Sequence, residues 1–179
     1  MGGDRLRNFD SLKYMDPRPI LVELRSIELE VARSNLPANV RALRTNDLRR
    51  YRELRDAALF CYGMGQCVGV TVEFSDHEAQ DHDFVAAWTI DGTQHFAPVQ
   101  LKDVVSHKLN PVASVQTEID KLKKYVAGKD LAVAIHLTRR AHFDPAKLVI
   151  PKLNIPRQRR SCRACWPCQS RYPRSGMYL

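Results

Sequence analysis

Three polar residues in the middle of the chain, Asp83, Gln100 and Lys102, could together carry out chemistry. Gln100 and Lys102 are two positions apart in a segment with the pattern of a strand, so their side chains point to the same face. The apolar Val99 and Leu101 point to the other face. If Asp83 pairs near Gln100 across a hairpin, a carboxylate, a carboxamide oxygen and an ammonium group lie together. Such a set can hold a hard divalent ion, bind a scissile phosphate and orient or deprotonate a water molecule.

The segments around these residues predict a meander of three antiparallel strands. Apolar residues alternate with other residues over 68–74, which predicts the first strand. A polar, acidic turn over 75–82 leads to a second strand over 84–90, which is rich in β-branched and aromatic residues. Asp91-Gly92 is the strongest hairpin signal in the chain, and a third strand follows over 95–105.

Two helical patterns precede this meander. Apolar residues spaced by three and four positions predict a helix over 19–34. A second helix is expected to begin at Thr45 or Asn46, either of which can cap it, and to end at Gly63 and Gly65. These helices are expected to pack on the faces of the sheet.

Another helix and further strands follow the meander. Ser114 or Thr117 opens this helix, and Gly128 closes it. The nearly continuous apolar run over 131–135 predicts a strand that is buried on both faces, and 147–153 could form a fifth strand. The order of the elements predicts an α/β fold: a mixed β-sheet, made of an antiparallel meander plus further strands, flanked by helices.

This order, with an Asp at the start of the second strand and a Gln-x-Lys on the third, resembles the PD-(D/E)XK, restriction-endonuclease-like nuclease superfamily. The matching positions are Asp83 and Gln100-Leu101-Lys102, and the resemblance spans roughly residues 47–153. It implies a restriction-endonuclease-like fold. It also implies a nuclease, specifically an endonuclease that hydrolyses phosphodiester bonds. DNA is the substrate that we expect, and Mg²⁺ or Mn²⁺ is the expected cofactor.

The resemblance further implies a role for each site residue. Asp83 would ligate Mg²⁺ directly, Gln100 would contribute a carbonyl or water-mediated contact, and Lys102 would position water and stabilise charge on the phosphate. Many members carry an acidic residue in the helix before the first strand, for which Glu53 is the first candidate here and Asp56 the second. Glu53 would bind a second metal ion or an outer-shell water.

Two positions depart from the pattern of this superfamily. Members usually have Glu or Asp where this chain has Gln100, and the amide removes one negative charge from the metal site. Glu53 and Asp83, with help from Glu73, would then supply the charge. Pro98 removes a backbone donor from a strand that the family places centrally, so we expect a bulge or a late strand start there.

A catalytically inactive member of the same fold is the alternative interpretation. The chain would then be a nucleic-acid-binding or protein-interaction module, and Gln100 would mark a metal site that has decayed. In the nuclease interpretation, Gln116 lies over the active site, and Arg139 and Arg140 contact backbone phosphate. A double-strand cut with one site per chain would favour a homodimer.

The net charge of +8 lies almost wholly at one end of the chain. Residues 151–179 hold seven Lys and Arg and no acidic residue, so the preceding 150 residues carry only +1. We divide the chain into a lead-in and helix over 1–44, a nuclease-like core over 45–155, and a basic, Cys-containing tail over 156–179. The tail is expected to be disordered because it has no helical or strand period. Because the chain before its basic end carries almost no net charge, the total charge of the protein does not argue for DNA as the partner.

Cysteines in the tail raise the question of a metal. Cys162, Cys165 and Cys168 have a spacing that could bring three thiolates to one zinc ion. Three ligands do not close a structural zinc site, so an unstructured tail is the favoured interpretation. The odd cysteine count of five, without a secretory signal, predicts reduced thiols and a cytoplasmic location.

Composition and motifs leave several other classes of protein without support. Hydrophobic residues at 44% and charged residues at 27% are typical of a globular domain and exclude collagen-like, coiled-coil and wholly disordered chains. Apolar runs such as 131–135 are too short to span a bilayer, so no membrane partner is expected. The sequence has no Gly-rich phosphate loop, no Gly-x-Ser-x-Gly and no His-Glu-x-x-His, which argues against P-loop, serine esterase and zinc protease chemistry.

Overall fold

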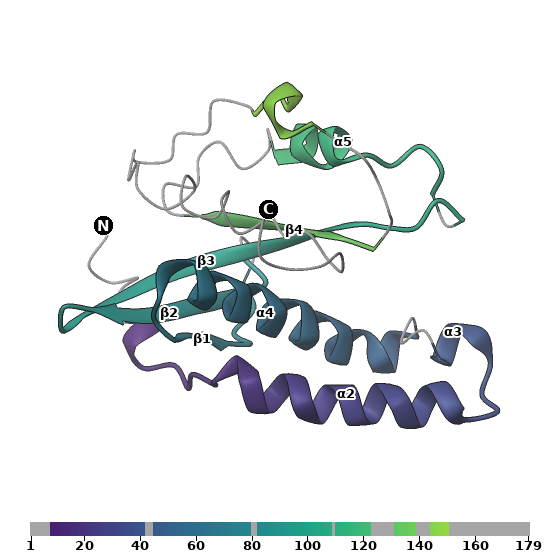
Figure 1. Ribbon diagram of the computed structural model, residues 1–179, viewed down its shortest axis with the longest axis horizontal. Coiled ribbons are helices and arrows are strands. Elements are labelled where there is room, and N and C mark those ends of the chain that lie inside the picture. Colours follow the sequence, from purple (N-terminus) through teal and green to yellow (C-terminus); the bar gives the residue numbers. More distant parts are fainter. Residues whose placement is uncertain are drawn as a thin grey trace. The chain divides into compact units, whose positions relative to one another are not determined.

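The structure is a computed structural model, and it describes residues 8–41, 45–79, 82–108, 110–122, 131–138 and 144–150. Figure 1 shows its elements, which in chain order are α2 (Pro17–Arg33), α3 (Ala38–Arg41), α4 (Asn46–Val68), β1 (Val72–Ser75), β2 (Phe84–Ile90), β3 (Thr93–Val104), α5 (Val115–Asp120), β4 (Ala132–Leu137) and the short 3-10 helix η2 (Pro145–Lys147). In this described part of the chain, no helix is both long enough and apolar enough to cross a membrane.

The four strands form one mixed sheet in the order β1-β2-β3-β4. β1 and β2 are antiparallel, with Val72 opposite Trp88, and β3 and β4 are parallel. Asp91 and Gly92 join β2 to β3, and both have positive φ angles, 50° and 73°, as a two-residue type I′ hairpin turn requires. The predicted α/β class, a mixed sheet flanked by helices, is therefore confirmed at this level.

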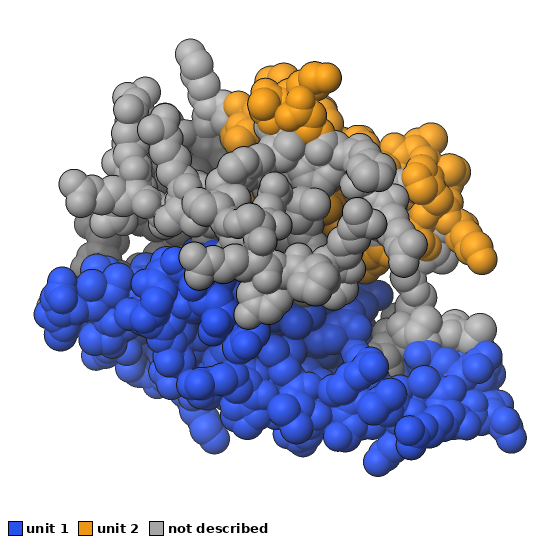
Figure 2. Space-filling view, in the orientation of Figure 1, with its two compact units in different colours: residues 1–77, 84–96 blue, residues 78–83, 97–179 orange. Residues whose placement is uncertain are grey.

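The chain divides into two compact units, which Figure 2 colours blue and orange. Unit 1 holds residues 1–77 and 84–96, and unit 2 holds residues 78–83 and the chain from 97 onward. β3 passes from the first unit into the second. The three-part division at 44/45 and 155/156 stays a prediction.

Unit 1 is organised around α4, which packs against both α2 and β1. An aromatic cluster joins this helix to the sheet, because the Phe84 ring meets the rings of Phe60 and Phe74 edge to face, with centroids 5.9 and 6.3 Å apart. An ion pair of 2.7 Å between Arg55 Nη1 and Glu28 Oε1 joins α4 to α2. Burial of apolar and aromatic surface thus holds the helical layer on β1 and β2.

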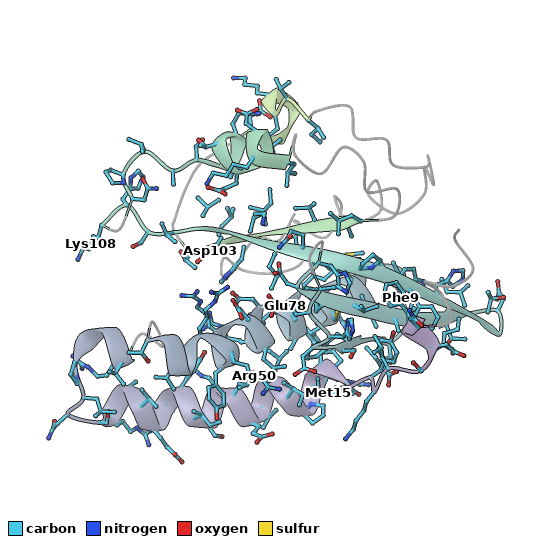
Figure 3. The ribbon with its side chains drawn as sticks, turned by 180° about the vertical axis from the view of Figure 1, so that it is seen from behind. Phe9, Met15, Arg50, Glu78, Asp103 and Lys108 are labelled. Atoms are coloured by element: carbon cyan, nitrogen blue, oxygen red, sulfur yellow. The ribbon has the colours of Figure 1, made fainter. Side chains whose placement is uncertain are left out.

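The segment before α2 closes the outer edge of β1. Met15, which Figure 3 labels, exchanges both backbone hydrogen bonds with Phe74, at 2.8 and 3.1 Å. Tyr14 and Phe9 both lie against the ring of Phe96. Burial raises the pKa of Tyr14 to about 12, and its hydroxyl donates to Phe9 O at 2.8 Å. Asp16 then caps α2 by accepting from Arg18 N–H at 2.9 Å, and the hydrogen bonds from Arg18 lower the pKa of this carboxyl.

α4 continues through Gly63 and Gly65 and ends at Gly69, which has a left-handed φ of 75°. The predicted end at the first two glycines is therefore wrong, and the first strand begins at Val72, so residues 68–71 belong to the helix end and the turn. Packing explains the difference: a Cβ on Gly65 would lie 2.8 Å from Val70 O. Close approach of the following turn, rather than helix termination, requires this glycine.

Pro98 does not delay the start of β3, which begins several residues earlier. Val99 O accepts from Asp83 N–H, and Leu101 N–H donates to the Asp83 side chain. Because backbone polar groups of successive strand residues alternate between the two edges, Pro98 faces the other edge, toward β4. Pairing with β4 begins only at Val99. Pro98 lies one residue before this pairing begins, so its missing N–H removes no hydrogen bond between β3 and β4. The expected late start of the strand is therefore wrong.

Unit 2 packs α5 on the parallel strand pair. Its core consists of Val104, Val115, Ile119 and Ile135, and the partly buried Val133, Leu137 and Leu148 pack against it. Ser114, one of the two residues predicted to open this helix, caps α5: its side chain accepts from Thr117 N–H at 3.0 Å. α5 ends at Asp120, with Lys121 as its C-cap, which is earlier than the predicted closure at Gly128. Gly128 itself lies outside the described residues.

The predicted fifth strand over 147–153 does not form where the structure describes it. Lys147 ends η2, and residues 148–150 belong to no strand. The backbone of Val149 is bonded by the side chain of Gln116 instead of by a neighbouring strand. An apolar run can satisfy its backbone through a side-chain amide, which strand periodicity does not reveal.

The close packing of Gly65 is testable by comparison with Gly63, which has no atom within 4 Å of a built Cβ. Gly65→Ala is expected to lower the free energy of unfolding by about 1–3 kcal/mol, because the backbone of the turn must move. Gly63→Ala is expected to be neutral or to stabilise by up to about 1 kcal/mol, through helix propensity. Urea unfolding measures both variants, and equal stabilities would contradict the packing argument.

Candidate functional site

Asp83 lies in the turn that leads into β2 and is joined to β3 by two hydrogen bonds. Its backbone N–H donates to Val99 O at 2.9 Å, and its Oδ2 accepts from Leu101 N–H at 2.5 Å. The chain before it is fixed by a tight pairing, in which Ala79 and His82 exchange backbone hydrogen bonds of 3.0 and 3.4 Å. The carboxylate therefore takes the place of a strand carbonyl and sets the position of this turn along β3.

The side chain of Gln100 meets this carboxylate. Its Nε2 donates to Asp83 Oδ2, the same oxygen that accepts from Leu101. Gln100 is only 8% exposed and Asp83 is half-buried, so the contact is partly shielded from water. In the part of the chain that the structure describes, Asp83 Oδ1 and Gln100 Oε1 accept no hydrogen bond. The predicted neighbours thus touch, but with the amide N–H turned to the carboxylate.

Lys102 follows two positions later on the same strand face. It is half-buried, interacts with neighbouring groups, and lies opposite Ile135 in the ladder with β4. Gln100 lies opposite Val133 in the same ladder. Ile135 belongs to the core of unit 2, and Val133 packs against that core, so Gln100 and Lys102 share the sheet face that α5 covers. The packing of unit 2 therefore positions both side chains.

The acidic residues predicted to assist Asp83 belong to unit 1. Glu53 is partly exposed on α4, with 42% of its side chain accessible, and pairs with Arg49 Nε at 2.6 Å. Asp56 is buried at 7% and accepts from the guanidinium of Arg55 at 3.2 and 3.3 Å. Glu73 is exposed on β1. Their participation in a metal site stays a prediction.

Gln116 uses both ends of its amide within unit 2. Its Nε2 donates to Val149 O at 3.0 Å, and its Oε1 accepts from Val149 N–H at 2.9 Å. Nε2 also lies 3.2 Å from Asp120 Oδ1. The observed task of this side chain is to hold 148–150 against α5, and nucleic-acid contact stays a prediction.

Two further predicted groups, the arginine pair and the cysteine group of the tail, lie outside the described residues: Arg139, Arg140, Cys162, Cys165 and Cys168. Within the described ranges, no three His, Cys, Asp or Glu side chains are grouped so that they could hold a metal ion. Asp83 supplies one carboxylate and Gln100 one carboxamide oxygen. These donors fit Mg²⁺ as a partial set, because protein sites often hold Mg²⁺ through one or two carboxylates plus substrate phosphates.

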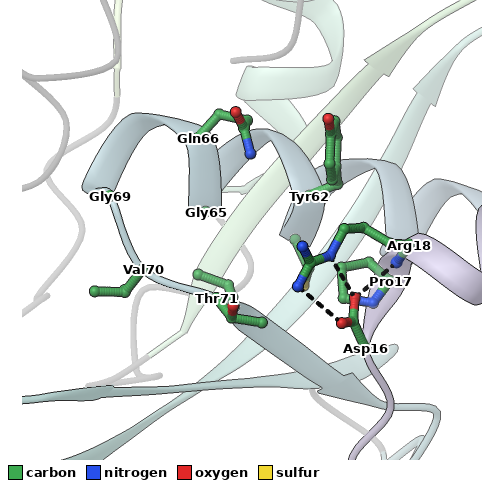
Figure 4. A pocket seen from close by; sticks show the side chains of 11 residues that line it. Asp16, Pro17, Arg18, Tyr62, Gly65, Gln66, Gly69, Val70 and Thr71 are labelled. Atoms are coloured by element: carbon green, nitrogen blue, oxygen red, sulfur yellow. Dashed lines mark hydrogen bonds and ion pairs between the residues drawn. The ribbon is translucent and has the colours of Figure 1, made fainter.

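A pocket of about 280 Å³ lies elsewhere, in unit 1, between the start of α2 and the end of α4. Figure 4 shows the ion pair of Arg18 with Asp16 on its wall, at 3.0 Å, with Tyr62 and Thr71 nearby. None of the predicted site residues lines it. The candidate site is therefore a contact between side chains of unit 2 rather than this pocket.

Sequence reasoning missed one member of the site, the backbone N–H of Leu101. Its apolar side chain suggested only packing, whereas its amide holds Asp83 in place. A signal was present in the sequence: an Asp directly before a strand is a residue type whose carboxylate often accepts from nearby backbone N–H groups.

The structural role of Asp83 is testable by stability. Asp83→Ala leaves Leu101 N–H and the buried Gln100 amide without their acceptor, so the free energy of unfolding should fall by about 2–3 kcal/mol. Asp76→Ala is the control: it removes a surface ion pair with Arg50 and should cost at most about 1 kcal/mol. Equal losses in urea unfolding would show that the Asp83 contacts do not stabilise the fold.

The chain was also compared with known proteins. No protein-family model matches it, and neither a curated protein nor a solved structure is significantly similar to it. The functional argument therefore depends on the residues themselves, and first of all on the contact between Asp83 and Gln100.

Proposed function

We propose that the protein is a divalent-metal-dependent nuclease with a restriction-endonuclease-like fold, which hydrolyses phosphodiester bonds in DNA. The observation that carries the proposal is the contact of Asp83 with Gln100, with Lys102 two residues further on the same strand face. The element order α4-β1-β2-β3-α5-β4 supports it as well, because it is the order that the resemblance to this nuclease superfamily implies.

Each residue has a defined task in this mechanism. Asp83 Oδ1 and Gln100 Oε1 would hold a Mg²⁺ ion, which supplies Lewis-acid stabilisation of the phosphate and lowers the pKa of a water molecule. The ammonium group of Lys102 orients the attacking water and stabilises negative charge that develops on the phosphate oxygens. The oxygen of the attacking water would form the new P–O bond and release a proton to solvent. The bond from phosphorus to the ester oxygen would break, and the leaving oxygen would take up a proton from water.

Contacts to the DNA phosphates that flank the reacting one would come from other residues. On α4, Arg50 is 82% exposed and pairs with Asp76 at 2.8 Å, and Arg49 pairs with Glu53. DNA phosphates can replace such surface carboxylates as partners, because the ion pairs are solvent-exposed and individually weak. A homodimer would bring two sites to the two strands of a duplex.

A catalytically inactive member of the same fold is the second candidate. One observation favours it: Gln100 presents an N–H donor to Asp83, which is the opposite of a metal ligand. In this case the pair would serve only to fix the turn on β3, and the protein would bind nucleic acid or another protein.

The nuclease proposal predicts cleavage of plasmid DNA that requires Mg²⁺ or Mn²⁺. Lys102→Ala should lower the rate by about 10²–10³-fold, the loss expected when one stabilising donor is removed from a transition state. Asp83→Asn, which keeps an acceptor for Leu101 N–H, should abolish cleavage. Lys147→Ala, which changes an exposed lysine of η2, should keep the wild-type rate.

The inactive candidate makes the opposite prediction. Folded wild-type protein would cut no nucleic acid with either metal, and Mn²⁺ calorimetry would show no heat that Asp83→Asn removes. DNA binding whose affinity falls with salt would persist in Asp83→Asn, because phosphate contacts alone would produce it. Metal-dependent cleavage lost in Asp83→Asn would rule this candidate out.

A further inference from the structure

The orientation of the Gln100 amide bears on how the proposed site would acquire its metal. A carboxamide has one end that donates and one that accepts. Here Nε2 faces Asp83 Oδ2, and the contact is partly buried. A cation shared by these two side chains needs an oxygen of Gln100 on that side. The amide must therefore turn by half a rotation about its last side-chain bond before both residues can ligate one ion.

The turned amide is stable only when a cation is present. Without one, Gln100 Oε1 would face a carboxylate oxygen, and the hydrogen bond from Nε2 would be lost. The backbone bond from Leu101 keeps the carboxylate in place, so Asp83 cannot readily avoid the repulsion by swinging away. Metal binding and amide rotation are thus coupled.

The pair of Asp83 and Gln100 offers little charge to a metal ion. Asp83 contributes one negative charge and Gln100 none. A divalent cation therefore meets a single carboxylate at this pair, and Lys102 on the same face of β3, which interacts with neighbouring groups, is itself a cation. A phosphodiester brings one negative charge to the reacting centre. This charge takes the place of the one that an Asp or Glu at position 100 would have supplied.

We propose that Gln100 is a gate that makes metal binding depend on the substrate. The amide keeps Asp83 in a metal-free arrangement, and its carbonyl oxygen turns to the site only when the cation and a nucleic-acid phosphate arrive together. This inference rests on the proposed nuclease function and adds the order of assembly. The gate would prevent the protein from holding a hydrolytically active metal in the absence of nucleic acid.

Calorimetric titration of the full chain with Mn²⁺ tests the gate, with and without a short DNA duplex whose phosphorothioate linkages keep the charge but hydrolyse slowly. Wild-type protein should bind Mn²⁺ at least about tenfold more tightly when the duplex is present, a coupling of ordinary size between two ligands. Gln100→Glu should bind at least about tenfold more tightly than wild type without the duplex. Adding Asp83→Ala to Gln100→Glu should remove that binding.

Gln94→Glu is the matched control, because it introduces the same charge at an exposed position of unit 1. It should bind Mn²⁺ as the wild type does. NMR of the wild-type protein gives a second measurement that needs no stable variant. The side-chain amide signal of Gln100 should shift on addition of Mg²⁺ with the duplex, but not on addition of Mg²⁺ alone.

The outcomes separate the gate from the function. Wild-type binding of Mn²⁺ that is equally tight without the duplex, with an unmoved Gln100 amide, would overturn the gate and leave the nuclease proposal standing. Absence of any binding that depends on Asp83, in wild type and Gln100→Glu and with the duplex present, would overturn both.

Discussion

The carboxylate of Asp83 is the interaction on which the candidate site depends. One oxygen accepts from the backbone of Leu101 and from the side chain of Gln100, and the backbone N–H of the same aspartate donates to Val99. These bonds fix the turn before β2 on the middle of β3. They also show which edge of β3 faces away from this turn, toward β4, and Pro98 lies on that edge one residue before the pairing with β4 begins. The side chain of Asp83 therefore holds this part of the fold together and is also the one that would bind the metal ion in the proposed chemistry.

Local signals predicted the elements that local sequence decides. The strand Phe84–Ile90 and the Asp91-Gly92 turn form as expected, since the turn requires two positive φ angles that few residue types adopt. The neighbourhood of Asp83 and Gln100 followed from the hairpin and from strand alternation. A contact across one tight turn is short-range information, which explains why one sequence was enough.

Tertiary contacts decided what the sequence could not predict. Gly65 looked like a helix end, but its missing Cβ serves the approach of Val70 O, so α4 runs on to Val68. Residues 148–150 had the pattern of a strand, but Gln116 bonds the backbone of Val149 among them. The direction of the Gln100 amide is beyond any pattern of residue types, because both ends have the same shape. Yet this direction separates a metal ligand from a structural donor.

The most direct measurement of the central claim is a crystal structure of the protein with Mn²⁺ and a DNA duplex, with the metal located by its anomalous scattering. We expect a peak bonded to Asp83 Oδ1, to Gln100 Oε1 and to a phosphate oxygen, with Lys102 directed to the same phosphate. A bound duplex with no peak beside Asp83, and with the Gln100 N–H still on the carboxylate, would contradict the account.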